Sequence, residues 1–223
     1  MVFLNVPFVE KDEAKALGAR WDGTVKKWYV QNREDYPKFQ KWILPDDYEQ
    51  CAVLCDYFYI VEGSHTCFKC GAQNRVVAFA TGNCYFFYHP EEYENQVPQY
   101  VEDDLQIESF LEPLNIIPGA LDYLKTTYNF HLGFSKFLKK NYFANHCNKC
   151  KVIQGQNFLF YEIDSPFIVR NSKSAEALSF HRVQLPFDVI ELSIRDDTRD
   201  EAEEIKYLIK NYSQVSDFVI ENS

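Results

Sequence analysis

The sequence of 223 residues lacks a long hydrophobic run and has no excess of basic residues. Because no apolar stretch approaches about 18 residues, we expect no membrane-spanning helix and no membrane partner. The first residues have neither the basic start nor the long apolar segment of a signal peptide, which favours a cytoplasmic protein. A net charge of −10, from 23 basic and 33 acidic residues, argues against a protein that wraps duplex DNA over its whole surface.

Glycine and methionine are also scarce, with eight residues and one residue, whereas aromatic residues make up 17% of the chain. Hydrophobic residues at 46% and charged residues at 25% are ordinary for a globular protein and exclude a disordered or fibrous chain. Many aromatic side chains and little glycine favour a stiff core that is rich in β-sheet.

The common catalytic and nucleotide-binding motifs HExxH, GxSxG, GxxxxGK[ST] and GxGxxG are absent from the sequence. Carboxylates gather near the C-terminal end of the sequence, at Asp196, Asp197, Asp200, Glu201, Glu203 and Glu204. A solvated helix start, which the helix dipole favours, is the simpler explanation of this cluster. We therefore expect a non-enzymatic protein, with a metal-dependent nuclease-like enzyme as an alternative.

Residues 1–45 are predicted to form a small β-α-β-β-α module. The pattern indicates a strand at 4–6, a helix over 10–17, a hairpin around Asp22-Gly23-Thr24 and a second helix over 35–43. Eight Lys or Arg against six Asp or Glu give this module a net charge of +2, so the remainder carries −12. This asymmetry suggests that the two parts face different partners.

All three tryptophans of the chain, Trp21, Trp28 and Trp42, lie in this module. Core anchoring is the expected role for Trp21 and Trp28, because so small a module needs large buried side chains. The alternative is an aromatic and basic face that binds bases or a peptide.

Residues 51–223 are predicted to form a second, mostly β domain. Strands are expected at 53–61, 75–80, 84–88, 158–161, 182–185 and 189–194, with Thr81-Gly82-Asn83 as a tight turn. An inserted helical region at about 104–143 would contain helices over 119–126 and 134–142, and a further helix is expected over 200–211. The fold class is therefore α+β.

Seven cysteines without an export signal predict reduced thiols rather than a disulfide framework. Four of them form two CxxC units, Cys67 with Cys70 and Cys147 with Cys150. A tight turn aims both thiolates of such a unit at one ion, and two units complete a tetrahedral site. We therefore expect one structural Zn²⁺ in a zinc-ribbon-like domain, although 76 residues separate the two units. Unpaired reduced thiols and a redox dithiol are the alternatives.

The remaining cysteines and two histidines are weaker candidates for the metal site. Cys51, Cys55 and Cys84 lie in apolar β surroundings and are expected to be buried small hydrophobes. His65 and His146 lie beside the CxxC units and are possible substitute ligands or outer-sphere partners, although surface or capping roles are more common.

The N-terminal module resembles a small bacterial domain of unknown function that is attached to plasmid primases and to multidomain proteins of mobile elements. The resemblance rests on Leu4 to Phe8, Glu10 to Asp22 and Lys26 to Val30, about a fifth of the chain. It implies a context of nucleic-acid metabolism but transfers no catalytic residue. The residues that it suggests for contact with single-stranded DNA or RNA, or with a protein partner, are Arg20, Lys26, Lys27, Trp28 and Tyr29.

The two CxxC units are similar to an uncharacterised bacterial zinc-binding pattern, CWKC…NHCxxCxxxQGxxFL. The matching segments are Cys67 to Cys70, with Phe68 in place of tryptophan, and Asn145 to Leu159. This similarity implies zinc at the four cysteines and no known reaction. The expected function is thus a zinc-stabilised protein that binds single-stranded nucleic acid, with a protein-interaction adaptor as the alternative.

Overall fold

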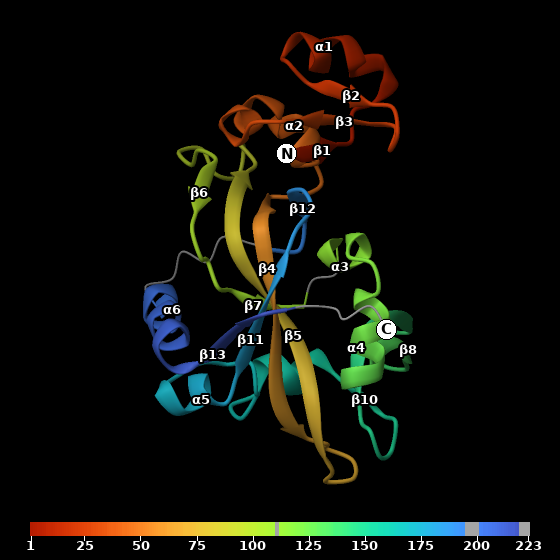
Figure 1. Ribbon diagram of the computed structural model, residues 1–223, viewed down its shortest axis with the longest axis vertical. Helices are drawn as coiled ribbons and strands as arrows, with labels where there is room; N and C mark the ends of the chain where they lie inside the picture. Colours follow the sequence, from red (N-terminus) through yellow and green to blue (C-terminus); the bar gives the residue numbers. More distant parts are fainter. Residues whose placement is uncertain (110–111, 195–200, 219–223) are drawn as a thin grey trace. The chain divides into compact units, whose positions relative to one another are not determined.

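The computed structural model describes residues 1–109, 112–194 and 201–218, and shows the predicted α+β fold (Figure 1). Contacts divide the described chain into two compact units. Unit 1 contains Met1–Phe58, Thr81–Asp104 and 184–194, and unit 2 contains Tyr59–Ala80, 105–183 and 201–218. These units differ from the expected domains 1–45 and 51–223, because segments from later in the chain join unit 1. Independent folding of residues 1–45 stays a prediction.

The N-terminal part of unit 1 has the predicted β-α-β-β-α order. Its elements are β1 (Val2–Leu4), α1 (Lys11–Ala16), β2 (Arg20–Asp22), β3 (Lys27–Val30), a 3-10 helix (Arg33–Phe39) and α2 (Gln40–Ile43). The three strands pair in the order β1-β3-β2. The second predicted helix is split into a 3-10 part and an α part, and Pro37, which lacks a backbone N–H, lies inside the former.

Later strands complete unit 1. Part of β4 (Gln50–Thr66) pairs antiparallel with β12 (Val189–Glu191), and part of β5 (Gln73–Tyr88) pairs antiparallel with β6 (Gln99–Val101). Arg33 donates to the carboxylates of Asp188 and Asp56 over 2.7–3.0 Å, and Tyr36 donates to Asp188 at 2.7 Å. Asp188 is only 4% exposed, so this ion cluster fixes the 3-10 helix to distant parts of the sequence.

The prediction of a tight turn at Thr81-Gly82-Asn83 is wrong, because β5 runs without interruption from Gln73 to Tyr88. Gly82 serves a different purpose from a turn. A Cβ atom at this position would collide with the backbone oxygen and the ring of Tyr57. The glycine therefore permits the close approach of a neighbouring segment rather than a reversal of the chain.

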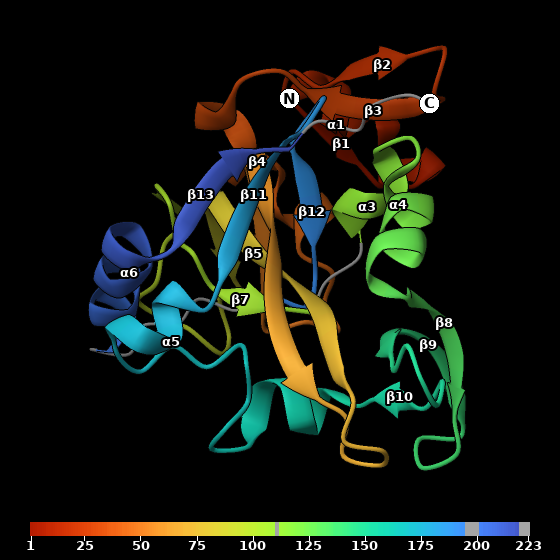
Figure 2. The same ribbon diagram turned by 60° about the horizontal axis from the view of Figure 1, so that its bottom comes forward.

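Unit 2 combines short helices with two groups of strands. The helices are α3 (Glu112–Ile116), α4 (Ala120–Tyr128), α5 (Ser172–Glu176) and α6 (Glu201–Tyr212), and the last of these matches the predicted C-terminal helix. The strands β8 (Phe130–Ser135), β9 (Lys140–His146) and β10 (Ile153–Gln154) form one sheet in the order β10-β9-β8 (Figure 2). The other strands are β7 (Ile107–Glu108), β11 (Ser179–Gln184) and β13 (Gln214–Asp217). β7 pairs with β5, and β11 and β13 pair with each other.

Two further predictions for unit 2 are wrong. The segment expected to be a helix over 134–142 instead contains the end of β8, a turn and the start of β9. In the turn, Leu138 N–H donates to Ser135 Oγ at 3.1 Å and Lys139 has a φ of 53°. Cross-strand pairing, a long-range interaction, overrides the local helical pattern here. The strand expected at 158–161 is one helical turn, Asn157–Tyr161. Within the described residues, no helix has the length and the apolar character that crossing a bilayer requires.

Candidate functional site

The two CxxC units have the same local geometry. The first follows β4 and precedes β5, and the second connects β9 to β10 (Figure 2). In both, the residue after the second cysteine is left-handed, with a φ of 68° at Gly71 and 60° at Lys151. Backbone hydrogen bonds of 2.9 Å close each turn, from Cys67 N–H to Ala72 and from Cys147 N–H to Val152. The sequence pattern thus folds into two equivalent knuckles.

The fold brings the sulfurs of both knuckles together. The four Sγ atoms all lie within 4.8 Å of one another, and the cysteines are free thiols. Cys67 and Cys150 are 3.7 Å apart and Cys70 and Cys147 are 3.6 Å apart. Bonds of about 2.3 Å to a tetrahedral ion would place thiolates about 3.8 Å from one another. These four side chains fit a metal ion and could hold one.

Hydrogen bonds to the sulfurs favour thiolates. The pKa of Cys147 falls to about 6, because the backbone N–H groups of Cys150 and Lys149 point at its sulfur. The pKa of Cys67 is also lowered: burial opposes ionisation, but the N–H groups of Cys70 and Lys69 outweigh it. A thiolate is the form that binds metal, so each knuckle prepares one ligand.

The pKa of Cys70 moves the other way and rises to about 11. The Ala72 N–H favours its thiolate, but burial and the sulfurs of the opposite knuckle together outweigh that hydrogen bond. Ionising all four thiols therefore costs electrostatic free energy, which a bound cation would offset.

Amide side chains hold the knuckles in place. Asn145 accepts from Val77 N–H and donates to Val77 C=O, both at 2.8 Å, while Gln154 Nε2 donates to Cys67 Sγ at 3.6 Å. Asn74 Oδ1 accepts from the backbone N–H of Asn148 at 2.8 Å, which links the base of the first knuckle to the second. Sequence reasoning included Asn145 and Gln154 in a pattern without giving them a role, and it missed Asn74, whose partner lies 74 residues away.

His146 and His65 lie outside the cluster of ligand atoms. Among the described residues, the group of close metal-binding side chains contains only the four cysteines. The ring of His146 stacks on His131 at 3.8 Å, and its Nδ1 lies 2.9 Å from Ala144 O. Burial lowers the pKa of both His65 and His146, which favours neutral rings.

The other side chains considered from the sequence have ordinary surroundings where the structure describes them. Cys51, Cys55 and Cys84 are fully buried, as expected of small hydrophobes. In the acidic cluster, Asp196, Asp197 and Asp200 lie outside the described residues. Glu203 forms an exposed ion pair with Lys206 at 3.0 Å.

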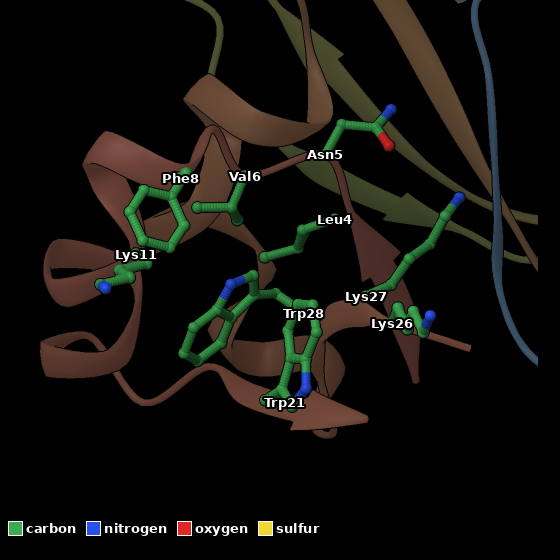
Figure 3. Close-up of a pocket in the computed structure, with 9 residues that line it drawn as sticks. All are labelled: Leu4, Asn5, Val6, Phe8, Lys11, Trp21, Lys26, Lys27 and Trp28. Carbon is green, nitrogen blue, oxygen red and sulfur yellow. The ribbon is translucent and has the colours of Figure 1, made fainter. Parts of the chain in front are cut away.

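The N-terminal sheet of unit 1 carries a pocket of about 440 Å³ (Figure 3). The indoles of Trp21 and Trp28 pack edge to face at 5.6 Å, and Phe8, Lys11, Lys26 and Lys27 also line the pocket. Trp42 is buried, but Trp21 is 53% exposed. Core anchoring is therefore wrong for Trp21. Trp28 is half-buried and packs against the core of unit 1.

The five suggested contact residues divide between the two faces of this sheet. Trp28 pairs with Trp21 and Leu4 across the strands, and Lys26 and Lys27 line the same pocket. Side chains alternate along a strand, so Arg20 and Tyr29 lie on the opposite face. Lys27 precedes Trp28 in β3 and borders the pocket with a side chain that runs away from the two indoles (Figure 3).

Phe3 lies on that opposite face too, because it pairs with Tyr29, and its ring packs against Phe187 at 4.9 Å. The structure thus joins only part of the predicted set. It adds Phe8, 79% exposed, and Lys11, whose amine lies 3.9 Å from the Phe8 ring centre.

Comparison with known proteins concerns the N-terminal segment. Two proteins from Escherichia coli, both called DNA primase TraC, are 60% and 55% identical to this chain over 40 residues, 18% of its length. Those 40 residues are 4% and 3% of the two primases, so the chain spans a small fraction of them. No solved structure matches the chain. Residues 1–44 match the family described as a domain of unknown function (DUF5710).

Proposed function

We propose that this protein is a zinc-stabilised binding protein whose N-terminal sheet contacts single-stranded nucleic acid. The observation that carries the proposal is an exposed indole, Trp21, beside Trp28 in a pocket that Lys11, Lys26 and Lys27 also line. Aromatic surfaces stack on bases of any sequence, and nearby ammonium groups attract phosphates.

Zinc is the metal that four thiolates with these separations favour. A site closed by four protein ligands has no open position for substrate, so the ion's role is structural. The ion would connect two knuckles that 76 residues separate, and its binding energy would add to the folding energy of unit 2. Unit 2 would then be zinc-ribbon-like, with metal at the tips of two strand pairs.

The likeness to a segment of DNA primases supports a place in nucleic-acid metabolism, in a mobile-element context. It covers the segment that holds the tryptophan pocket. The local charge of +2 is small, so binding should rest on stacking more than on counterion release, and it should prefer single strands to duplexes.

Metal analysis tests the zinc assignment. Purified protein should contain one zinc per chain with four sulfur ligands by X-ray absorption, and Cys67→Ala should lose the metal. Cys51→Ala, a change at a buried thiol in unit 1, is the matched control and should retain it. Full zinc content in Cys67→Ala would contradict the assignment.

Fluorescence anisotropy with labelled oligothymidine tests the nucleic-acid assignment. Trp21→Ala should weaken binding by about tenfold, the loss of one stacking contact, and Lys27→Glu should weaken it in a salt-dependent way. Val25→Ala and Lys15→Glu, at exposed positions that do not line the pocket, are the matched controls. Flat titrations of the wild-type protein at low salt would favour the protein-adaptor alternative, whereas binding that is unchanged in both pocket variants would mean that the tryptophan pocket is not the nucleic-acid contact.

A further inference from the structure

A second basic and aromatic surface lies in unit 2, at the end that carries the knuckles. Between residues 123 and 161 the sequence has no Asp or Glu but six lysines, in a chain whose net charge is −10. The six are Lys125, Lys136, Lys139, Lys140, Lys149 and Lys151, and Lys69 in the first knuckle adds another. This segment contains β8, β9, the second knuckle and β10.

The same end of unit 2 exposes large aromatic side chains. Phe137, in the turn between β8 and β9, is 93% exposed, and Phe134 and Phe68 are more than half exposed. They line one pocket of about 840 Å³ together with Lys136, Lys151 and Phe158. We call these six residues the knuckle face. Apolar patches of this kind on a protein surface usually mark a binding site.

The knuckles position the aromatic side chains. Phe68 is the second residue of the first knuckle, and its ring stacks on that of Phe158 with centres 4.6 Å apart and planes 14° from parallel. The two rings come from segments about 90 residues apart in sequence and meet where the four cysteines converge. A bound ion would therefore also fix the knuckle face.

We propose that the knuckle face binds single-stranded nucleic acid, with phosphates at the lysines and bases on the exposed rings. The lysines of this segment give the surface a local positive charge that complements a polyanion, and Glu162, which accepts from Asn157 at 2.9 Å, is a carboxylate at the edge of the pocket. A duplex hides the faces of its bases, so exposed phenylalanines gain most from a single strand. The proposal does not rest on the tryptophan pocket of unit 1, which is a separate surface with its own residues.

The test is anisotropy titration of the zinc-loaded full chain with labelled oligothymidine and oligouridine. Phe137→Ala should weaken binding of both by about tenfold, whereas Ile163→Ala, at an apolar position 84% exposed outside this pocket, should not. Lys136→Glu should reduce the slope of log K against log salt by about 0.7 or more. Lys173→Glu, an equal charge change at an exposed lysine of α5, should alter the slope less.

The two nucleic-acid proposals fail in different ways. If only the knuckle face binds, Trp21→Ala has no effect and Phe137→Ala weakens binding by about tenfold. If only the tryptophan pocket binds, Phe137→Ala and Lys136→Glu equal the wild type although zinc content and circular dichroism are normal, and the knuckle proposal is overturned. Equal affinity for a duplex, or equal competition by polyglutamate, would also overturn it.

Discussion

Replacement of Asn145 by alanine should destabilise unit 2 strongly although it removes only one small side chain. The Asn145 amide exchanges two hydrogen bonds of 2.8 Å with the backbone of Val77 and so acts as a strand partner for β5. Asn145 is 4% exposed and Val77 is 1% exposed, so water does not replace the lost partner in the folded protein. Each buried group left unpaired costs about 1–3 kcal/mol, so the two groups of Val77 give a loss of roughly 2–6 kcal/mol.

The same change should weaken metal binding. Asn145 precedes His146 and Cys147 at the end of β9, so its hydrogen bonds set where the second knuckle begins. Loss of an interaction that orients metal ligands commonly lowers affinity by about 10- to 100-fold. Competition with a chromophoric chelator should measure this loss.

Urea unfolding followed by far-ultraviolet circular dichroism measures the stability change, and amide hydrogen exchange at Val77 localises it. Asn157→Ala is the control, because that exposed side chain makes a single bond of 2.9 Å to Glu162. The control should lose less than about 0.5 kcal/mol. An equally small loss in Asn145→Ala, with Val77 still protected, would refute the assigned role.

Three further changes test other parts of the structure. Gly133→Ala should cost about 1–3 kcal/mol in urea unfolding, because its Cβ would meet the buried ring of His146, whereas Gly23→Ala, with open space around it, should be neutral. Glu62 accepts from Arg75 at 2.6 Å and from Tyr128 at 2.9 Å, and chiefly the Arg75 bond lowers its pKa. The ionised Glu62 carboxylate therefore stabilises the fold above its unfolded-state pKa of about 4.3, and this stabilisation is lost as the pH falls through the lowered pKa of the folded state. Glu62→Gln should lower the free energy of unfolding by roughly 1–2 kcal/mol at pH 7 and by much less at pH 3. Chelation should make four thiols reactive toward a disulfide reagent while Cys51, Cys55 and Cys84 stay protected until denaturation; reaction of all seven on chelation alone would contradict this assignment.

Local patterns were sufficient for the N-terminal elements and for the choice of the four cysteines. Short spacings determine both: Gly18 ends a helix, Asp22-Gly23-Thr24 turns a hairpin, and two residues between thiols form a knuckle. Each depends on a few neighbouring residues, so no tertiary contact was needed to recognise it.

Long-range contacts decided the remaining features. Gly82 looks like a turn residue but gives room to Tyr57, and the segment 134–142 looks helical but pairs as strands. Tryptophan is a residue type that is usually buried, yet Trp21 lies on the edge strand β2 and is exposed. The sequence determined which residues form each knuckle, whereas only the tertiary structure joined four sulfurs and gathered lysines and phenylalanines around them. Local propensity acts over a few residues, but side chains far apart in sequence meet only when strands pair and pack.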